Sequence, residues 1–231
     1  MKSPSELPLF WNVVFLCLTC TAANGKNYNA DVCVYGGTAS GVMAVLAAEK
    51  EGSKVILIEP TRSLGGMTGG GINHLDWGKG ETVGGSTYKI LMEGLKDQKR
   101  AHGGHAKHGI GNKQYRERFK KLVEDQGITV IYDHRVGKVQ VGDETFNKPT
   151  RQQPIAMGEK IPSKNKNNSI ESIFLDYAPV DETGCPIPEP KKRNVITVSA
   201  KVFIDCSYEG DLLSMSGVRY TWGRESREHY N

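Results

Sequence analysis

The chain carries, at positions 32–41, the stretch Val32-Cys33-Val34-Tyr35-Gly36-Gly37-Thr38-Ala39-Ser40-Gly41. Four consecutive apolar residues without alternation are typical of a parallel strand that is buried on both faces. A glycine-rich turn follows, then a helix rich in small residues that Gly52 ends, then a second apolar run at 55–58. This order of strand, turn, helix and strand predicts the first βαβ unit of a dinucleotide-binding fold.

The residues around the turn each have an expected task. Gly36 permits the tight turn, and Gly41 lets the helix approach the strand, so that helix N-terminal amides point at a pyrophosphate. Thr38 replaces the middle glycine of the G-x-G-x-x-G pattern, which restricts the approach of the backbone to the phosphate. Glu59 ends the second run, where an acid accepts ribose hydroxyls, and we expect it to face solvent. An ordinary tight turn is the alternative.

Two later segments add to this pattern. Leu64-Gly65-Gly66-Met67-Thr68-Gly69-Gly70-Gly71 contains too many glycines for a stable helix or strand interior, and predicts an irregular path beside a ligand rather than a linker. The other segment is Phe203-Ile204-Asp205-Cys206-Ser207-Tyr208-Glu209-Gly210-Asp211-Leu212. With the 34–41 turn and Glu59, these segments resemble the FAD-dependent oxidoreductases of the glutathione-reductase-like flavoprotein class, over residues 31–231.

The resemblance implies where FAD would lie on this chain. The first turn would hold the pyrophosphate, Glu59 the adenosine ribose, and the backbone at Val136 the adenine. Arg62 and the segment 65–67 would pass along the adenosine, pyrophosphate and ribityl portions. Asp211 matches an acid near the ribityl or pyrophosphate region, whereas Tyr208 stands in place of a glycine. The expected cofactor-binding residues are Gly36, Gly37, Thr38, Ala39, Ser40, Gly41, Glu59, Arg62, Gly65, Gly66, Met67, Val136 and Asp211.

The rest of the chain predicts an α/β fold, a Rossmann-like FAD/NAD(P)-binding domain with a parallel sheet and a β-meander crossover. Apolar spacing favours helices at 84–99 and around 115–123. Three short meander strands are expected between polar, unpacked loops at 145–169 and 178–193, and a further strand then returns to the sheet. The expected strands are 128–132, 136–141, 170–177, 194–199 and 201–205.

The first 25 residues differ from the rest of the sequence. The apolar run at 9–18 is too short to span a bilayer, which takes ~20 residues, and small residues follow it. We expect a cleaved signal peptide at 1–25, export through the secretory route without stable membrane insertion, and an FAD-binding domain at 26–231. A buried N-terminal strand is the alternative.

Composition limits the classes of partner. The chain has 231 residues, of which 38% are hydrophobic and 24% are charged, as in an ordinary globular protein. The net charge of +4 is mild and the cations are spread out, so no nucleic-acid partner is expected. His102, His105 and His108 lie among glycines without a nearby carboxylate, and predict a solvated loop rather than a metal site.

Two classes of function remain open. The first is an FAD-dependent oxidoreductase that transfers hydride between a small organic substrate and FAD, where FAD supplies the chemistry and the protein positions it. The alternative is a truncated, non-catalytic dinucleotide-binding or interaction protein, because 220–226 resembles the entrance to a further, substrate-binding part. The sequence predicts no catalytic residue, substrate or oligomeric state.

Overall fold

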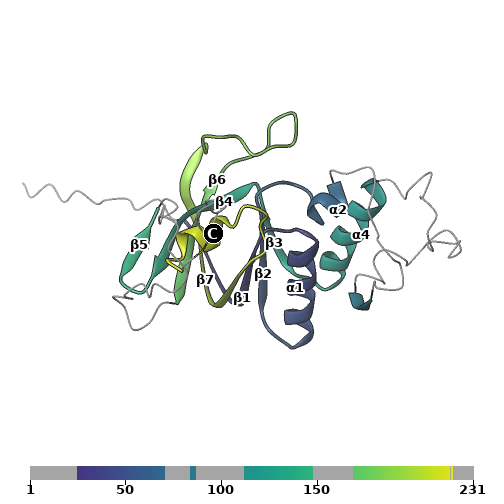
Figure 1. Ribbon diagram of the computed structural model, residues 1–231, viewed down its shortest axis with the longest axis horizontal. Helices are drawn as coiled ribbons and strands as arrows, with labels where there is room; N and C mark the ends of the chain where they lie inside the picture. The colour runs from purple at the N-terminus through teal and green to yellow at the C-terminus, as the bar shows by residue number, and fades with distance from the viewer. Residues whose placement is uncertain (1–24, 71–83, 87–111, 148–168, 219, 221–231) are drawn as a thin grey trace, which may run out of the picture.

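The computed structural model of the chain describes residues 25–70, 84–86, 112–147, 169–218 and 220 (Figure 1). The expected signal peptide, nearly all of the helix expected at 84–99, and the three-histidine loop lie outside these residues. The predictions for them stay predictions.

One mixed sheet of seven strands organises the described residues, in the order β3-β2-β1-β7-β6-β4-β5. The four strands β3, β2, β1 and β7 are parallel, whereas β6, β4 and β5 continue the sheet in antiparallel pairs. The strands are β1 Lys26–Tyr35, β2 Val55–Glu59, β3 Thr129–Tyr132, β4 His134–Val141, β5 Glu144–Phe146, β6 Ile170–Tyr177 and β7 Lys192–Asp205. The predicted α/β fold with a parallel sheet and a meander crossover is confirmed.

The helices are α1 Ala39–Lys50, α2 Gly66–Gly70, α4 Asn112–Asp125 and α5 Asp211–Met215. The helices α1 and α4 cover one face of the parallel strands, and the meander and α5 lie on the other (Figure 1). Along β1, Val34 packs with the helix-side cluster, whereas Cys33 and Tyr35 pack with the meander-side cluster, as the alternation of a strand requires. Both clusters are buried, which explains why the strand sequences are apolar without alternation.

The strand β7 corrects the prediction of two separate strands at 194–199 and 201–205. It is one strand of 14 residues. Residues 192–199 pair with β6 and residues 196–205 pair with β1, from Lys26 opposite Ile196 to Tyr35 opposite Asp205. No turn-forming residue interrupts the strand after Asn194, so the chain has no local reason to break there. The short strand β5 likewise extends the meander into the start of the expected 145–169 loop.

The helix α2 corrects the prediction that the second glycine-rich segment avoids regular structure. Glycine has a low intrinsic helix propensity, so the five residues of this helix depend on stabilising contacts with neighbouring elements. Leu64 is buried just before it, and Arg116 of α4 donates to the carbonyls of Gly69 and Gly70, both at 3.4 Å. These contacts satisfy helix C-terminal carbonyls that have no partner within the helix.

The contact between α1 and the end of β1 depends on Gly41. A Cβ atom at this position would lie 1.9 Å from the carbonyl oxygen of Gly36, which is backbone and cannot rotate away. The absence of a side chain therefore lets the first turn of α1 lie directly against the strand end, as the sequence predicts.

We expect Gly41→Ala to destabilise the protein by about 1–3 kcal/mol, because the added methyl group forces α1 away from β1. Without this contact, alanine would stabilise a helix interior by roughly 0.5–1 kcal/mol relative to glycine. Urea unfolding followed by circular dichroism measures the difference. Gly84→Ala is the matched control, because its Cβ would meet nothing within 4 Å. Equal stability of the two variants would contradict the close-packing argument.

Candidate functional site

Three neighbouring strands, β2, β1 and β7, have their carboxyl ends side by side. Tyr35 of β1 lies in register with Ile58 of β2 and with Asp205 of β7. These strands are parallel, so the loops that follow them meet at this end of the sheet; the loops are 36–38, 60–65 and 206–210. Ligands of open α/β sheets bind outside the carboxyl ends of the strands, so this end of the sheet is the candidate site.

Thr38 uses its hydroxyl to fix the first glycine turn. Thr38 Oγ1 accepts the amide of Gly41 at 3.3 Å, which makes Thr38 the N-cap of α1. The same hydroxyl donates to the carbonyl of Cys206 at 2.8 Å and lies 2.9 Å from Ser40 Oγ. The residue that replaces the middle glycine therefore ties the turn to the loop after β7, a contact that glycine cannot make.

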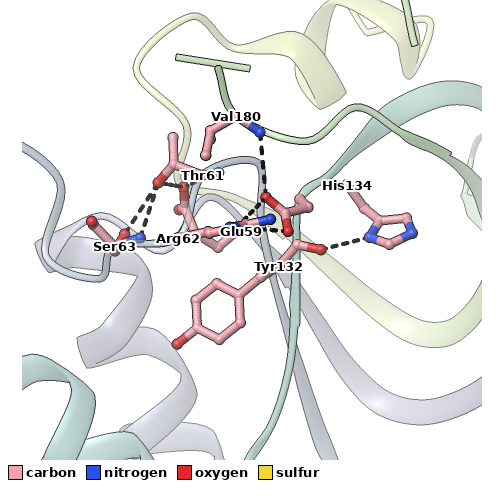
Figure 2. Close-up of polar contacts among 8 residues, drawn as sticks. Glu59, Thr61, Arg62, Ser63, Tyr132, His134 and Val180 are labelled. Carbon is pink, nitrogen blue, oxygen red and sulfur yellow. Dashed lines mark hydrogen bonds and ion pairs between the residues drawn. The ribbon is translucent and has the colours of Figure 1, made fainter. Parts of the chain in front are cut away.

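Glu59 is buried, which corrects the expectation that it faces solvent. Its side chain binds three donors. Oε2 accepts the amide of Gly37 at 2.7 Å. Oε1 accepts the amide and the hydroxyl of Thr61 at 2.7 and 2.5 Å (Figure 2). The residue is only 6% exposed, because the glycine turn and the loop after β2 both close over it. Burial raises the pKa of Glu59 above its ordinary value, although the bonds from Thr61 and Gly37 oppose this shift.

The second glycine-rich segment lies against the first turn. The amide of Gly65 donates to the carbonyl of Gly37 at 2.7 Å, and Thr38 and Gly65 form an isolated parallel bridge. From the other side, the amide of Met67 donates to Tyr208 Oη at 2.9 Å. The tyrosine that stands in place of a glycine thus links the loop after β7 to the start of α2.

Asp211 lies at the first position of α5, on the far side of the β7 loop. Burial raises its pKa, as do the neighbouring Glu209 and Asp205, whereas Arg135 opposes the shift. Asp205 holds this loop in place, since Oδ1 accepts the amide and hydroxyl of Ser207 and Oδ2 accepts the amide of Leu213.

The resemblance places the adenine beside the backbone of Val136, which the structure finds in β4, a strand that begins at His134. The amide of Val136 donates to Tyr35 Oη at 3.3 Å, and its side chain packs in the meander-side core. Asp133 lies at the junction between β3 and β4. The adenine contact at Val136 stays a prediction.

Thr61 and Asp133 also belong to this region, although no sequence motif indicates them, and Cys206 contributes its thiol and its carbonyl. Thr61 binds Glu59, and Asp133 accepts both bonds from Arg62 Nε. An acidic residue between two apolar strands was the available signal for Asp133. Burial raises the pKa of the Cys206 thiol, and the hydroxyl of Ser40, which hydrogen-bonds to it, acts in the opposite direction.

No group of three or more histidine, cysteine, aspartate or glutamate side chains is placed to hold a metal ion in the described part of the chain. Within those ranges, no helix is both long and apolar enough to cross a membrane.

Comparison with known proteins agrees with this geometry. The family model described as FAD dependent oxidoreductase matches residues 31–157 and 187–231. The chain belongs to this family. FAD is therefore the cofactor to test against the strand-end site. No curated protein matches the chain.

Solved structures with similar folds share little sequence with the chain. A geranylgeranyl bacteriochlorophyll reductase-like protein from Thermoplasma acidophilum is 16% identical, with a TM-score of 0.46, over 84% of this chain and 43% of that one. THI4 from Thermovibrio ammonificans is 16% identical, with a TM-score of 0.45, over 81% and 61%. A 3-ketosteroid-Δ4-(5α)-dehydrogenase from Rhodococcus jostii RHA1 is 16% identical, with a TM-score of 0.39, over 80% and 47%. The matched part is less than two thirds of each of these proteins.

The residues at the strand ends fit a dinucleotide such as FAD. The amides of the first turn of α1 have no intrahelical partners, and a glycine turn without side chains lies beside them. Glu59 accepts three donors, whereas an ionised carboxylate offers about four lone-pair positions. One position on Oε2 therefore remains for a ribose hydroxyl.

We expect Glu59→Ala to lower the free energy of unfolding by about 2–4 kcal/mol even without a cofactor. The substitution leaves buried donors of Gly37 and Thr61 without their acceptor, and each unsatisfied donor costs about 1–3 kcal/mol. Urea unfolding of the apoprotein is the measurement. Glu51→Ala, at the exposed C-terminal end of α1, is the control and should change stability by about 0.5 kcal/mol or less. A Glu59→Ala variant as stable as this control would show that the buried carboxylate contributes nothing to folding.

Proposed function

We propose that this chain provides the FAD-binding part of an oxidoreductase that transfers hydride between a small organic substrate and FAD. The observation that carries the proposal is the meeting of three loops over one buried carboxylate. Glu59 binds the turn before α1 and the loop after β2, and Thr38 binds that same turn to the loop after β7. The family match supports FAD as the ligand.

The residues of each loop take a different part of the cofactor. The N-terminal amides of α1 and the hydroxyl of Ser40 bind the pyrophosphate, because a helix N-terminus favours negative charge. Glu59 accepts a ribose hydroxyl, and residues 65–67 follow the chain of the cofactor beside the turn. Asp211 lies on the β7 side, toward the ribityl portion. When bound, FAD supplies the hydride chemistry, and these residues orient it.

The charge of Glu59 also selects the nucleotide. A carboxylate at the end of β2 accepts ribose hydroxyls and repels a 2′-phosphate, so the site prefers FAD or NAD to NADP. The same residue holds the glycine turn in place, so the selective group cannot move aside for a phosphorylated ribose without releasing the turn.

The test is a titration of the purified protein with FAD. We expect the wild-type chain to bind FAD, with flavin absorbance in the bound state, and Glu59→Gln to bind it roughly 10- to 150-fold more weakly, because a hydrogen bond to a charged group contributes about 1.5–3 kcal/mol. Calorimetry at a temperature where circular dichroism shows each variant to be folded separates binding from stability.

The matched control for this titration is Glu51→Gln, which removes the same charge from the other end of α1. Equal dissociation constants for Glu59→Gln and Glu51→Gln would remove Glu59 from the ribose site. A wild-type chain that stays without flavin at saturating FAD would contradict the proposed function as a whole.

A further inference from the structure

A charged pair at the junction of β3 and β4 has no role in the arrangement above. Arg62 Nε donates to both carboxylate oxygens of Asp133, at 2.9 Å each. The side chain of Arg62 is 61% exposed, whereas that of Asp133 is 14% exposed. The pair therefore joins a largely shielded acid to an exposed cation.

Two chain segments fix the position of Asp133. Its amide donates to the carbonyl of Thr61 in the loop after β2, while in the loop after β6 the amide of Ala178 donates to its carbonyl at 2.9 Å and the amide of Val180 donates to Oδ1 at 3.4 Å. Asp133 has φ 61°, in the left-handed region that aspartate tolerates better than most residues. Its carboxylate is thus held by the loop after β2 and the loop after β6 together.

This acid in turn fixes the orientation of Arg62. With Nε bound, the plane of the guanidinium group is set, because the five N–H donors of arginine form a rigid fork. Within the described ranges, the two terminal amino groups have no protein acceptor. Arg62 lies in the loop after β2, three residues after Glu59 (Figure 2). Its side chain is exposed, so these donors are accessible to a ligand near Glu59.

We propose that Asp133 is a positioning residue for the cofactor, which acts through Arg62 on the adenosine half. This inference rests on the proposed function. A planar guanidinium group stacks on an aromatic ring and donates hydrogen bonds at its rim, which suits an adenine or its ribose. An exposed arginine loses considerable side-chain freedom when it binds a ligand. The bonds to Asp133 already restrict the Arg62 side chain before a ligand binds, so less side-chain entropy is lost on binding.

The experiment uses ADP as a probe of the adenosine half. Asp133→Asn preserves the size and the left-handed backbone of the residue but removes the charge that binds Arg62 Nε. We expect the affinity for ADP and for FAD to fall about 3- to 10-fold, within the range of a partly exposed ion pair and its oriented donors. The free energy of unfolding, measured by urea titration, is the parallel readout. Asp143→Asn, in the exposed turn between β4 and β5, is the control and should bind as wild type does.

A double-mutant cycle with Arg62→Gln distinguishes positioning from a general structural role. If Asp133 acts through Arg62, Asp133→Asn has no further effect on ADP affinity in the Arg62→Gln background. An equal loss in both backgrounds, or wild-type affinity for Asp133→Asn, would overturn the proposal. If Asp133→Asn does not fold, Arg62→Lys replaces it in the test. Lysine keeps the positive charge but lacks the planar fork of donors, so we expect weaker ADP binding. Unchanged ADP affinity would overturn the proposal.

The results also separate this proposal from the proposed function. A wild-type chain that binds FAD, with Asp133→Asn unchanged, removes only the role of Asp133. A wild-type chain that binds neither FAD nor ADP removes both.

Discussion

The parallel pairing of β1 with β7 is the constraint on which the rest of this structure depends. It extends from Lys26 opposite Ile196 to Tyr35 opposite Asp205, and it places the loop after β7 beside the glycine turn. The hydrogen bond from Thr38 to the carbonyl of Cys206 exists only because of this register. A shift of one residue would exchange the two faces of β7 and remove Phe203 from the meander-side core.

Glu59 combines structural and ligand-binding tasks in one side chain. Burial of a carboxylate is unfavourable unless donors surround it, and here the amides of Gly37 and Thr61 and the Thr61 hydroxyl supply that environment. The donors come from both loops that the proposed cofactor would touch. Ligand binding and loop stability are consequently coupled, and a variant of Glu59 must be judged on both.

The local part of the fold was predictable from sequence, because it rests on patterns within 30 residues. The runs at 32–35 and 55–58, with glycines between them, predict the end of β1, then α1 and β2, although β1 begins earlier, at Lys26. The structure of α2 was not predictable, because Arg116, more than 40 residues away, satisfies its carbonyl groups. The burial of Glu59 was missed for a similar reason, since it depends on how two loops close over the strand end.

Errors at the level of strands had a different cause. Propensity locates extended residues but gives no sign of where a strand changes partner, so the continuous β7 was read as two strands. The same limit affected the start of β4, which lies at His134 rather than at the expected Val136. The sequence predicts the turn at 36–41 and Glu59 as site residues, and this stays a prediction, whereas the contacts of Arg62 and Thr38 become visible only in the fold.

The bond between Thr38 and Cys206 joins residues 168 positions apart, and this separation has a consequence for biosynthesis. The N-terminal residues 26–59 leave the ribosome long before their partner strand exists. During that interval β1 presents an open edge, and the glycine turn lacks the contact that holds it to the β7 loop. Contacts of such long range close slowly, because loop-closure entropy is lost before they form. The strand-end site is thus completed only after the residues of β7 have emerged.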